Sequence, residues 1–253
     1  MKLRKFSRFA AVVGALVLSA AFVPMANAAP GLQVYFNFNS DAAGAAPPYT
    51  SIAVCTYGGI FPRQQTTLFN EAVSGFPAGQ ISIEGGEGTT DNQFSGDLSG
   101  AGNALILGGN ANQATPYCFD IGSFSTQGLT SVSLSFAIEV DSGSFTRLTL
   151  AYGTDGTTWT NFDNIDLSLI SDDLFHVITS NLPNDNTVND QSTFYLQFCF
   201  SGSHDASGDV NIDNIQVNAV PEPSSYIGGL LGIIGLCWYQ RRRFMRLLSL
   251  RSA

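Results

Sequence analysis

Residues 130 to 140 read Thr-Ser-Val-Ser-Leu-Ser-Phe-Ala-Ile-Glu-Val, in which large apolar residues alternate with small or polar ones. Successive side chains of a β-strand point to opposite faces, so this spacing places Val132, Leu134, Phe136 and the next two apolar residues on one face. The other face carries serines, an alanine and a glutamate. The stretch therefore predicts a long strand that is buried on one face only, as is usual in antiparallel sheets.

Similar segments lie on both sides of this strand. In residues 193–200, the four apolar residues of an alternating run again share one face. An Asp155-Gly156 step between two further segments is typical of a hairpin turn that needs a positive backbone φ. Residues 66–73 are expected to hold a turn of helix instead. The remaining strands are expected at residues 33–39, 51–56, 80–84, 103–107, 146–152, 157–162, 175–179 and 209–218.

No stretch of residues 29–219 predicts a long amphipathic helix, and many short strands with polar turns favour an all-β, antiparallel β-sandwich. The closing segment, residues 208–217, is similar to the last strand of jelly-roll modules of the galactose-binding-like and carbohydrate-binding kind. That resemblance implies a jelly-roll β-sandwich. Asp213-Asn214 divides the apolar residues of this segment between two faces, so a β-bulge there is expected to turn all of them inward. These residues are Val210, Ile212, Ile215 and Val217.

The N-terminus has the three parts of a secretory signal peptide. Four basic residues lie within the first eight positions, residues 9–23 are apolar and uncharged, and Ala26-Asn27-Ala28 supplies small residues before the cleavage site. We therefore expect signal peptidase to remove residues 1–28, so that the mature chain begins at Ala29.

The C-terminus, residues 220–253, resembles the PEP-CTERM sorting domain of Gram-negative envelope proteins. The motif Pro221-Glu222-Pro223 precedes an apolar run, Tyr226–Tyr239, which is followed by Arg241-Arg242-Arg243 in a basic tail, residues 241–253. The resemblance implies processing by an exosortase, a membrane transpeptidase. The alternative is an ordinary C-terminal anchor.

The physical character of these parts agrees with a membrane-anchored precursor. Proline disfavours helix, so the motif is expected to be extended and accessible. A transmembrane helix at about residues 226–240 would be short for a bilayer. The arginine excess holds its distal flank in the cytoplasm, which places residues 29–219 outside. The chain is thus expected to cross the inner membrane and, after processing, to reach the cell surface or extracellular matrix.

Residues 29–219 are strongly acidic. They contain 19 Asp and Glu residues against only Arg63 and Arg147, which gives a net charge of −17, and they contain no lysine. Such a surface repels nucleic acid and anionic lipid, so neither is an expected partner of this domain. Its carboxylates are either solvated or available to divalent cations.

The cysteines fit an oxidising compartment. Cys237 lies in the C-terminal apolar run, which leaves Cys55, Cys118 and Cys199 for one bridge and one free thiol. Cys118 and Cys199 each lie between aromatic residues in strand-like segments, so they are the favoured disulfide pair. The chain has no CxxC motif, so a zinc or dithiol redox site is not expected.

Motifs for catalysis are missing from the sequence. No serine has glycine both two positions before and two positions after it, and there is no HExxH, GxGxxG or P-loop. The chain is therefore not expected to be an enzyme, and no catalytic residue is predicted.

Two sets of residues are candidate ligand sites. Asp209, Asn211 and Asp213 place oxygen-bearing side chains at alternate positions, which makes a structural calcium ion a candidate cofactor. The other interpretation is that these three residues form turns and solvent-exposed strand positions. Tyr152 and Trp159 flank the predicted hairpin and are candidates for stacking on a sugar ring. The alternative is that Trp159 covers the hairpin's own apolar face.

Three functions are compatible with these features. The leading hypothesis is a non-enzymatic surface or extracellular-matrix protein of the exopolysaccharide or biofilm, whose acidic shell interacts with polysaccharide or divalent ions. The second is a carbohydrate-binding module with a defined sugar site. The third is a secreted hydrolase whose site has no recognisable motif.

Overall fold

The structure is a computed structural model. It describes residues 31–39, 41–50, 66–71, 74–94, 100–109, 115–202 and 208–222, together with positions 235, 238 and 239. The predicted signal peptide, the strand expected at residues 51–56, Pro223 and Arg241-Arg242-Arg243 lie outside these residues, as does most of the predicted transmembrane segment. Within the described residues, no helix has both the length and the apolar character needed to span a bilayer.

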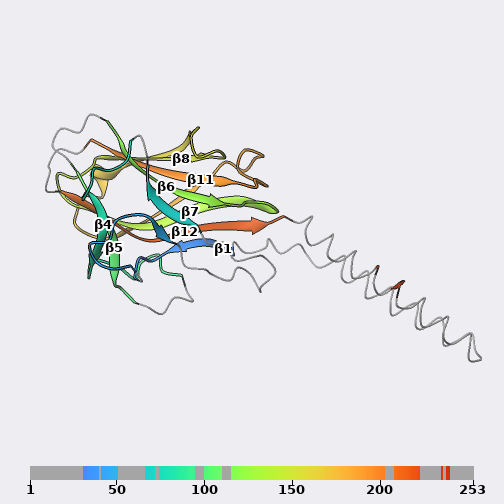
Figure 1. Ribbon diagram of the computed structural model, residues 1–253, viewed down its shortest axis with the longest axis horizontal. Coiled ribbons are helices and arrows are strands. Elements are labelled where there is room, and N and C mark those ends of the chain that lie inside the picture. Colours follow the sequence, from blue (N-terminus) through green and yellow to red (C-terminus); the bar gives the residue numbers. More distant parts are fainter. Residues whose placement is uncertain are drawn as a thin grey trace, which may run out of the picture.

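Two antiparallel sheets pack face to face as a jelly-roll β-sandwich (Figure 1). Sheet A has the order β10 (His176–Asn181), β7 (Leu129–Val140), β12 (Asp209–Pro221), β5 (Asn103–Gly108), β4 (Ile81–Gly85), and β1 (Gly31–Phe36) also pairs with β12. Sheet B has the order β2 (Tyr49–Thr50), β3 (Thr67–Asn70), β6 (Tyr117–Phe124), β11 (Phe194–Ser201), β8 (Arg147–Gly153), β9 (Thr160–Asp166). A short 3-10 helix, η2 (Leu167–Leu169), follows β9.

The core lies between the sheets and contains many aromatic side chains. Every apolar residue of the alternating run in β7 is buried, as the sequence predicts. Phe136 of sheet A meets Phe198 of sheet B edge to face, with ring centroids 5.4 Å apart, and Phe198 stacks on Phe119 at 4.7 Å. Large buried rings dominate the energy of such a core. All four apolar residues of the alternating run in β11 are fully buried: Phe194, Leu196, Phe198 and Phe200.

The predicted bulge in β12 is confirmed. The register of β12 against β7 shifts between Asp213 and Gln216, and Asn214 adopts a left-handed φ of 52°. Asn is one of the few residues that tolerate this conformation. The extra residue returns the chain to the same face, so Val210, Ile212, Ile215 and Val217 are all fully buried.

The helical turn expected within residues 66–73 is wrong, because Thr67–Asn70 forms strand β3. Leu68 pairs with Ile121 of β6 on one side and with Tyr49 of β2 on the other. These long-range pairings, together with complete burial of Leu68, override a weak local preference.

The end of β12 differs from the accessible motif that the sequence predicts. The strand continues through Pro221, which pairs with Leu129 and is buried. Glu222 then donates its backbone N–H to the carbonyl oxygen of Gly128 at 2.8 Å. Pro221 is extended as expected, but Pro221 and Glu222 belong to the folded sandwich, which ends beyond the predicted boundary at residue 219.

Candidate functional site

The outer faces of the two sheets differ in what covers them. On sheet A, the loop of residues 86–94 lies across β12 and is held by Asp213 and Asn214. Asp213 accepts the Thr89 N–H at 2.9 Å, and Asn214 donates through its Nδ2 to the carbonyl oxygens of Thr89 at 2.7 Å and Asp91 at 2.9 Å. This part of sheet A is therefore closed to a ligand.

The outer face of sheet B carries an array of polar and aromatic side chains, which we call the sheet B face; Gln197 and Asp120 are buried on it, while Tyr195 is half-buried. The core residues of β11 alternate with Tyr195, Gln197 and Cys199, so these three side chains point outward. Strand register then defines three rows across the face. They are Asn164–Thr149–Cys199–Cys118, Asn161–Ala151–Gln197–Asp120–Phe69, and Gly153–Tyr195–Gly122.

Aromatic rings occupy the end of the face nearest the β8–β9 hairpin. The ring of Tyr195 lies directly over Gly122, where a Cβ would overlap it. A Cβ on Gly153 would lie 3.4 Å from Cε3 of Trp159, so the indole covers this second glycine. Both aromatic side chains are partly exposed, and neither the Tyr195 hydroxyl nor the Trp159 N–H has a hydrogen-bond partner among the described residues. The polar groups of both rings are thus unpaired within the described part of the chain.

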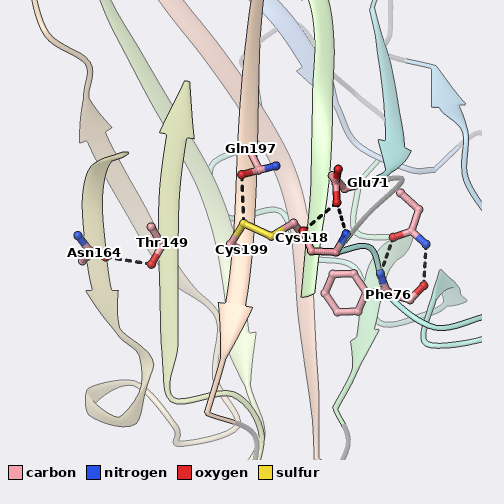
Figure 2. The surroundings of a disulfide bond; sticks show 9 residues. Glu71, Phe76, Cys118, Thr149, Asn164, Gln197 and Cys199 are labelled. Atoms are coloured by element: carbon pink, nitrogen blue, oxygen red, sulfur yellow. Dashed lines mark hydrogen bonds between the residues drawn. A yellow bond between two sulfur atoms is a disulfide. The ribbon is translucent and has the colours of Figure 1, made fainter. Parts of the chain in front are cut away.

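Hydrogen-bonding side chains and a disulfide occupy the other two rows of the sheet B face. Figure 2 shows Asn164, Thr149 and the Cys118–Cys199 bridge in one row, with Thr149 donating its hydroxyl to Asn164 Oδ1 at 2.9 Å. Gln197 Oε1 lies 3.3 Å from Cys199 Sγ, and the side chain of Gln197 also bonds to Asp120. The Gln197 side chain thus lies between the disulfide and Asp120.

Asp120 is a buried carboxyl in the middle row. It is only 2 % exposed, and its Oδ1 has no hydrogen-bond partner. Burial raises the pKa of Asp120 to about 7, the bond from Gln197 opposes this rise, and the charge of Glu71 adds to it. An ionised carboxylate is costly in such a place, so the folded protein favours the protonated acid.

We expect folding stability to fall as pH rises from about 4 to 7, and Asp120→Asn to reduce this fall. The folded pKa lies above the ordinary value of 3.8, so the folded state holds a proton that the unfolded chain releases across this window. Melting temperatures at several pH values measure the slope. Asp166→Asn is the control, because its serine hydrogen bonds lower the pKa of Asp166 and its effect lies below pH 4. Equal slopes for wild type and Asp120→Asn would contradict the prediction.

Cys118 and Cys199 form a disulfide with an S–S distance of 2.01 Å, the pairing that the sequence favoured. The two residues are directly opposite each other in the β6–β11 ladder. The segment between β3 and β4 lies against this point, where the Cys118 N–H donates to the carbonyl oxygen of Ser74 at 2.7 Å. The bridge thus joins two strands that carry the sheet B face.

Of the two predicted sugar-stacking residues, only Trp159 lies on the sheet B face. Tyr152 belongs to the core: it stacks on Phe194 with centroids 5.8 Å apart, and its hydroxyl is 2.9 Å from Thr187 Oγ1. The stacking role expected for Tyr152 is therefore wrong. Hairpin spacing alone does not reveal which face of the strand each aromatic occupies.

The predicted calcium ligands do not converge. Asp209, Asn211 and Asp213 point from one face of β12 at steps of about 6.6 Å, which is too far apart for all three to share one ion. Asn211 donates to Glu139 Oε2 at 3.3 Å, and the Asp213 carboxylate accepts two backbone N–H groups. No group of three or more His, Cys, Asp or Glu side chains within the described ranges is arranged to hold a metal ion. A structural calcium ion as such stays a prediction.

Sequence reasoning missed Tyr195, Gln197 and Asp120. The first two had a usable signal, because the alternation that buries Phe194 and Leu196 necessarily turns the residues between them outward. Asp120 had no such signal, since its burial depends on strands that are distant in sequence.

Comparison with known proteins gives structural likeness only. No family model matches the sequence, and no curated protein matches it. The K2 cleaved adhesin domain of Lys-gingipain is 14% identical over 72% of this chain and 97% of its own, with a TM-score of 0.42. The CBM22-1 xylan-binding domain from Paenibacillus barcinonensis is 11% identical over 78% of this chain and 99% of its own, at 0.38. A CBM28 module specific for non-crystalline cellulose is 14% identical over 54% of this chain and 80% of its own, at 0.36.

Proposed function

We propose that the chain is an extracytoplasmic, non-enzymatic protein that binds polysaccharide on the sheet B face. The observation that carries this proposal is the pair of partly exposed rings, Tyr195 and Trp159, with the amide of Asn161 in the next row of the same face and that of Asn164 in the row beyond it. Rings stack on the apolar faces of sugars, while amides and hydroxyls bond to their hydroxyl groups. The geometry thus favours a defined sugar site over a diffuse interaction of an acidic shell.

Charge limits the class of polysaccharide. The domain has a net charge of −17, and Arg147 is the only arginine or lysine among the described residues of the sandwich. Uronic acids and sulfated sugars would be repelled at close range. A neutral polysaccharide is therefore the proposed ligand.

We expect Tyr195→Ala and Trp159→Ala each to weaken polysaccharide binding about tenfold or more, a loss of about 1.4 kcal/mol, since each removes one stacking ring. The assay is affinity electrophoresis or calorimetry of the full chain with soluble xylan, β-1,4-galactan and non-crystalline cellulose. Leu169→Ala is the matched control, because Leu169 is an exposed apolar residue at 81 % exposure in η2, outside the sheet B face.

Three results would contradict this function. The first is binding that survives both ring substitutions, and the second is binding that is strongest for anionic alginate and disappears with salt, which favours the acidic-shell hypothesis. The third is release of new reducing ends from any of the three polysaccharides, which would establish a hydrolase.

We also propose, from the sequence resemblance, that export and exosortase-type processing bring the domain to the cell surface or matrix. Signal peptidase and exosortase are then its processing partners, and the inner membrane is a transient one. Recovery of the chain from the cytosol with Met1 and Ala253 both intact would contradict this route.

A further inference from the structure

The loop between β8 and β9 is organised by one carboxylate. Asp155 Oδ1 accepts the backbone N–H groups of Thr157 at 2.9 Å and Thr158 at 2.7 Å, and its Oδ2 accepts the Thr158 hydroxyl at 2.8 Å. An aspartate that bonds its own following backbone imposes a specific turn on it. The bonds from Thr158 and Thr157 hold the pKa of Asp155 well below its ordinary range, so the carboxylate remains charged at neutral pH.

This loop contacts both rings of the sheet B face. Gly156, the residue after the carboxylate, has a φ of +71°, and a Cβ added there would lie 3.3 Å from Cε1 and Cζ of Tyr195. The turn therefore rests against one side of the tyrosine ring. Thr158 leads directly into Trp159, whose indole covers Gly153. The β8–β9 loop thus contacts the ring of Tyr195 and sets the backbone position of Trp159.

We propose that Asp155 is the positioning residue for the Tyr195–Trp159 pair and that its turn sets the spacing at which two rings meet one neutral glycan chain. Asp155 acts through the loop and does not touch the glycan. This inference rests on the proposed function for its ligand, while the positioning of the rings stands on the geometry alone.

The test uses the full chain carrying Trp238→Phe, so that Trp159 is its only tryptophan. Acrylamide quenching of Trp159 is measured without ligand, and binding is measured with the same xylan, galactan and cellulose. Asp155→Ala is expected to change the quenching constant about twofold and to weaken binding about tenfold, as Trp159→Ala does. Asp155→Asn keeps the Oδ1 acceptor and is expected to restore both. Asp166→Ala is the matched control, because Asp166 bonds the N–H and hydroxyl of Ser168 in the same way but lies away from the rings.

Unchanged quenching in Asp155→Ala would overturn the inference, whatever happens to binding. So would altered quenching in Asp166→Ala, because the effect would then not be specific to this turn. Failure of the parent chain to bind any of the three polysaccharides would overturn the proposed function and the glycan spacing. The quenching result would still decide whether Asp155 positions Trp159.

Discussion

Replacing Cys118 and Cys199 together with serine is expected to lower the free energy of unfolding by about 4.5 kcal/mol. The bridge closes a loop with a sequence separation of 81 residues, so its loss restores considerable freedom to the unfolded chain. For a domain of this size, the melting temperature should drop by roughly 10 to 15 °C. Thermal melts of the full chain, with and without reductant, measure the effect.

The control for this experiment is wild-type protein treated with reductant, which should melt at the temperature of the double serine variant. Thr149→Ala, from the same row of the sheet B face, removes a hydroxyl but no cross-link and should cost about 1 kcal/mol or less. A double serine variant that melts within about 2 °C of wild type would show that the β6–β11 ladder alone supplies the stability.

Asn214→Ala is the second substitution with a large expected effect, about 4 kcal/mol of unfolding free energy. The side chain makes two bonds to the carbonyls of Thr89 and Asp91, and its Oδ1 accepts the Tyr35 hydroxyl at 2.7 Å. All three are buried or partly buried, at about 1 kcal/mol each, and alanine adds about 1 kcal/mol of strain at a φ of 52°. Urea unfolding measures the change.

Two further variants separate the contribution of the hydrogen bonds from that of the backbone strain. Asn214→Gly loses the same bonds but tolerates the left-handed backbone, so it isolates the hydrogen bonds. Asn92→Gly removes a single bond, from its Nδ2 to the Asn214 carbonyl at 2.8 Å, while glycine tolerates the left-handed φ of 55° at this position, so it should cost about 1 kcal/mol. A loss below about 1 kcal/mol for Asn214→Ala would mean that the loop of residues 86–94 detaches from sheet A without consequence.

The alternation of apolar and polar residues was enough to predict the strands that have one apolar face and one polar face. The alternating run of β7 and the phenylalanine-rich run of β11 are buried as predicted. The β12 bulge could also be derived, because only an inserted residue brings Ile212 and Ile215 to the same face. In these strands, the sequence pattern alone is sufficient to predict which side chains are buried.

The site required information that no single segment holds. Tyr152 and Trp159 flank the same loop, yet Tyr152 is opposite Leu196 of β11 and is buried in the core, whereas Trp159 lies outside the strands and covers Gly153. Asp120 is perturbed by Gln197 and Glu71, which come from distant parts of the chain. The strand at Leu68 likewise exists because β2 and β6 lie on either side of it. Contacts between segments that are distant in sequence determine the burial and secondary structure of such residues.

The burial of Pro221 at the end of β12 gives the sorting proposal a kinetic consequence. Under the proposed processing, a transpeptidase would bind a backbone segment that is already paired, Pro221 with Leu129 and Glu222 with Gly128. Binding would require the last residues of β12 to separate from their partners. The frequency of this local opening depends on the local stability of the strand. The stability of the strand end would then limit the rate of processing. Substitutions near Gly128 would change that rate without altering the motif.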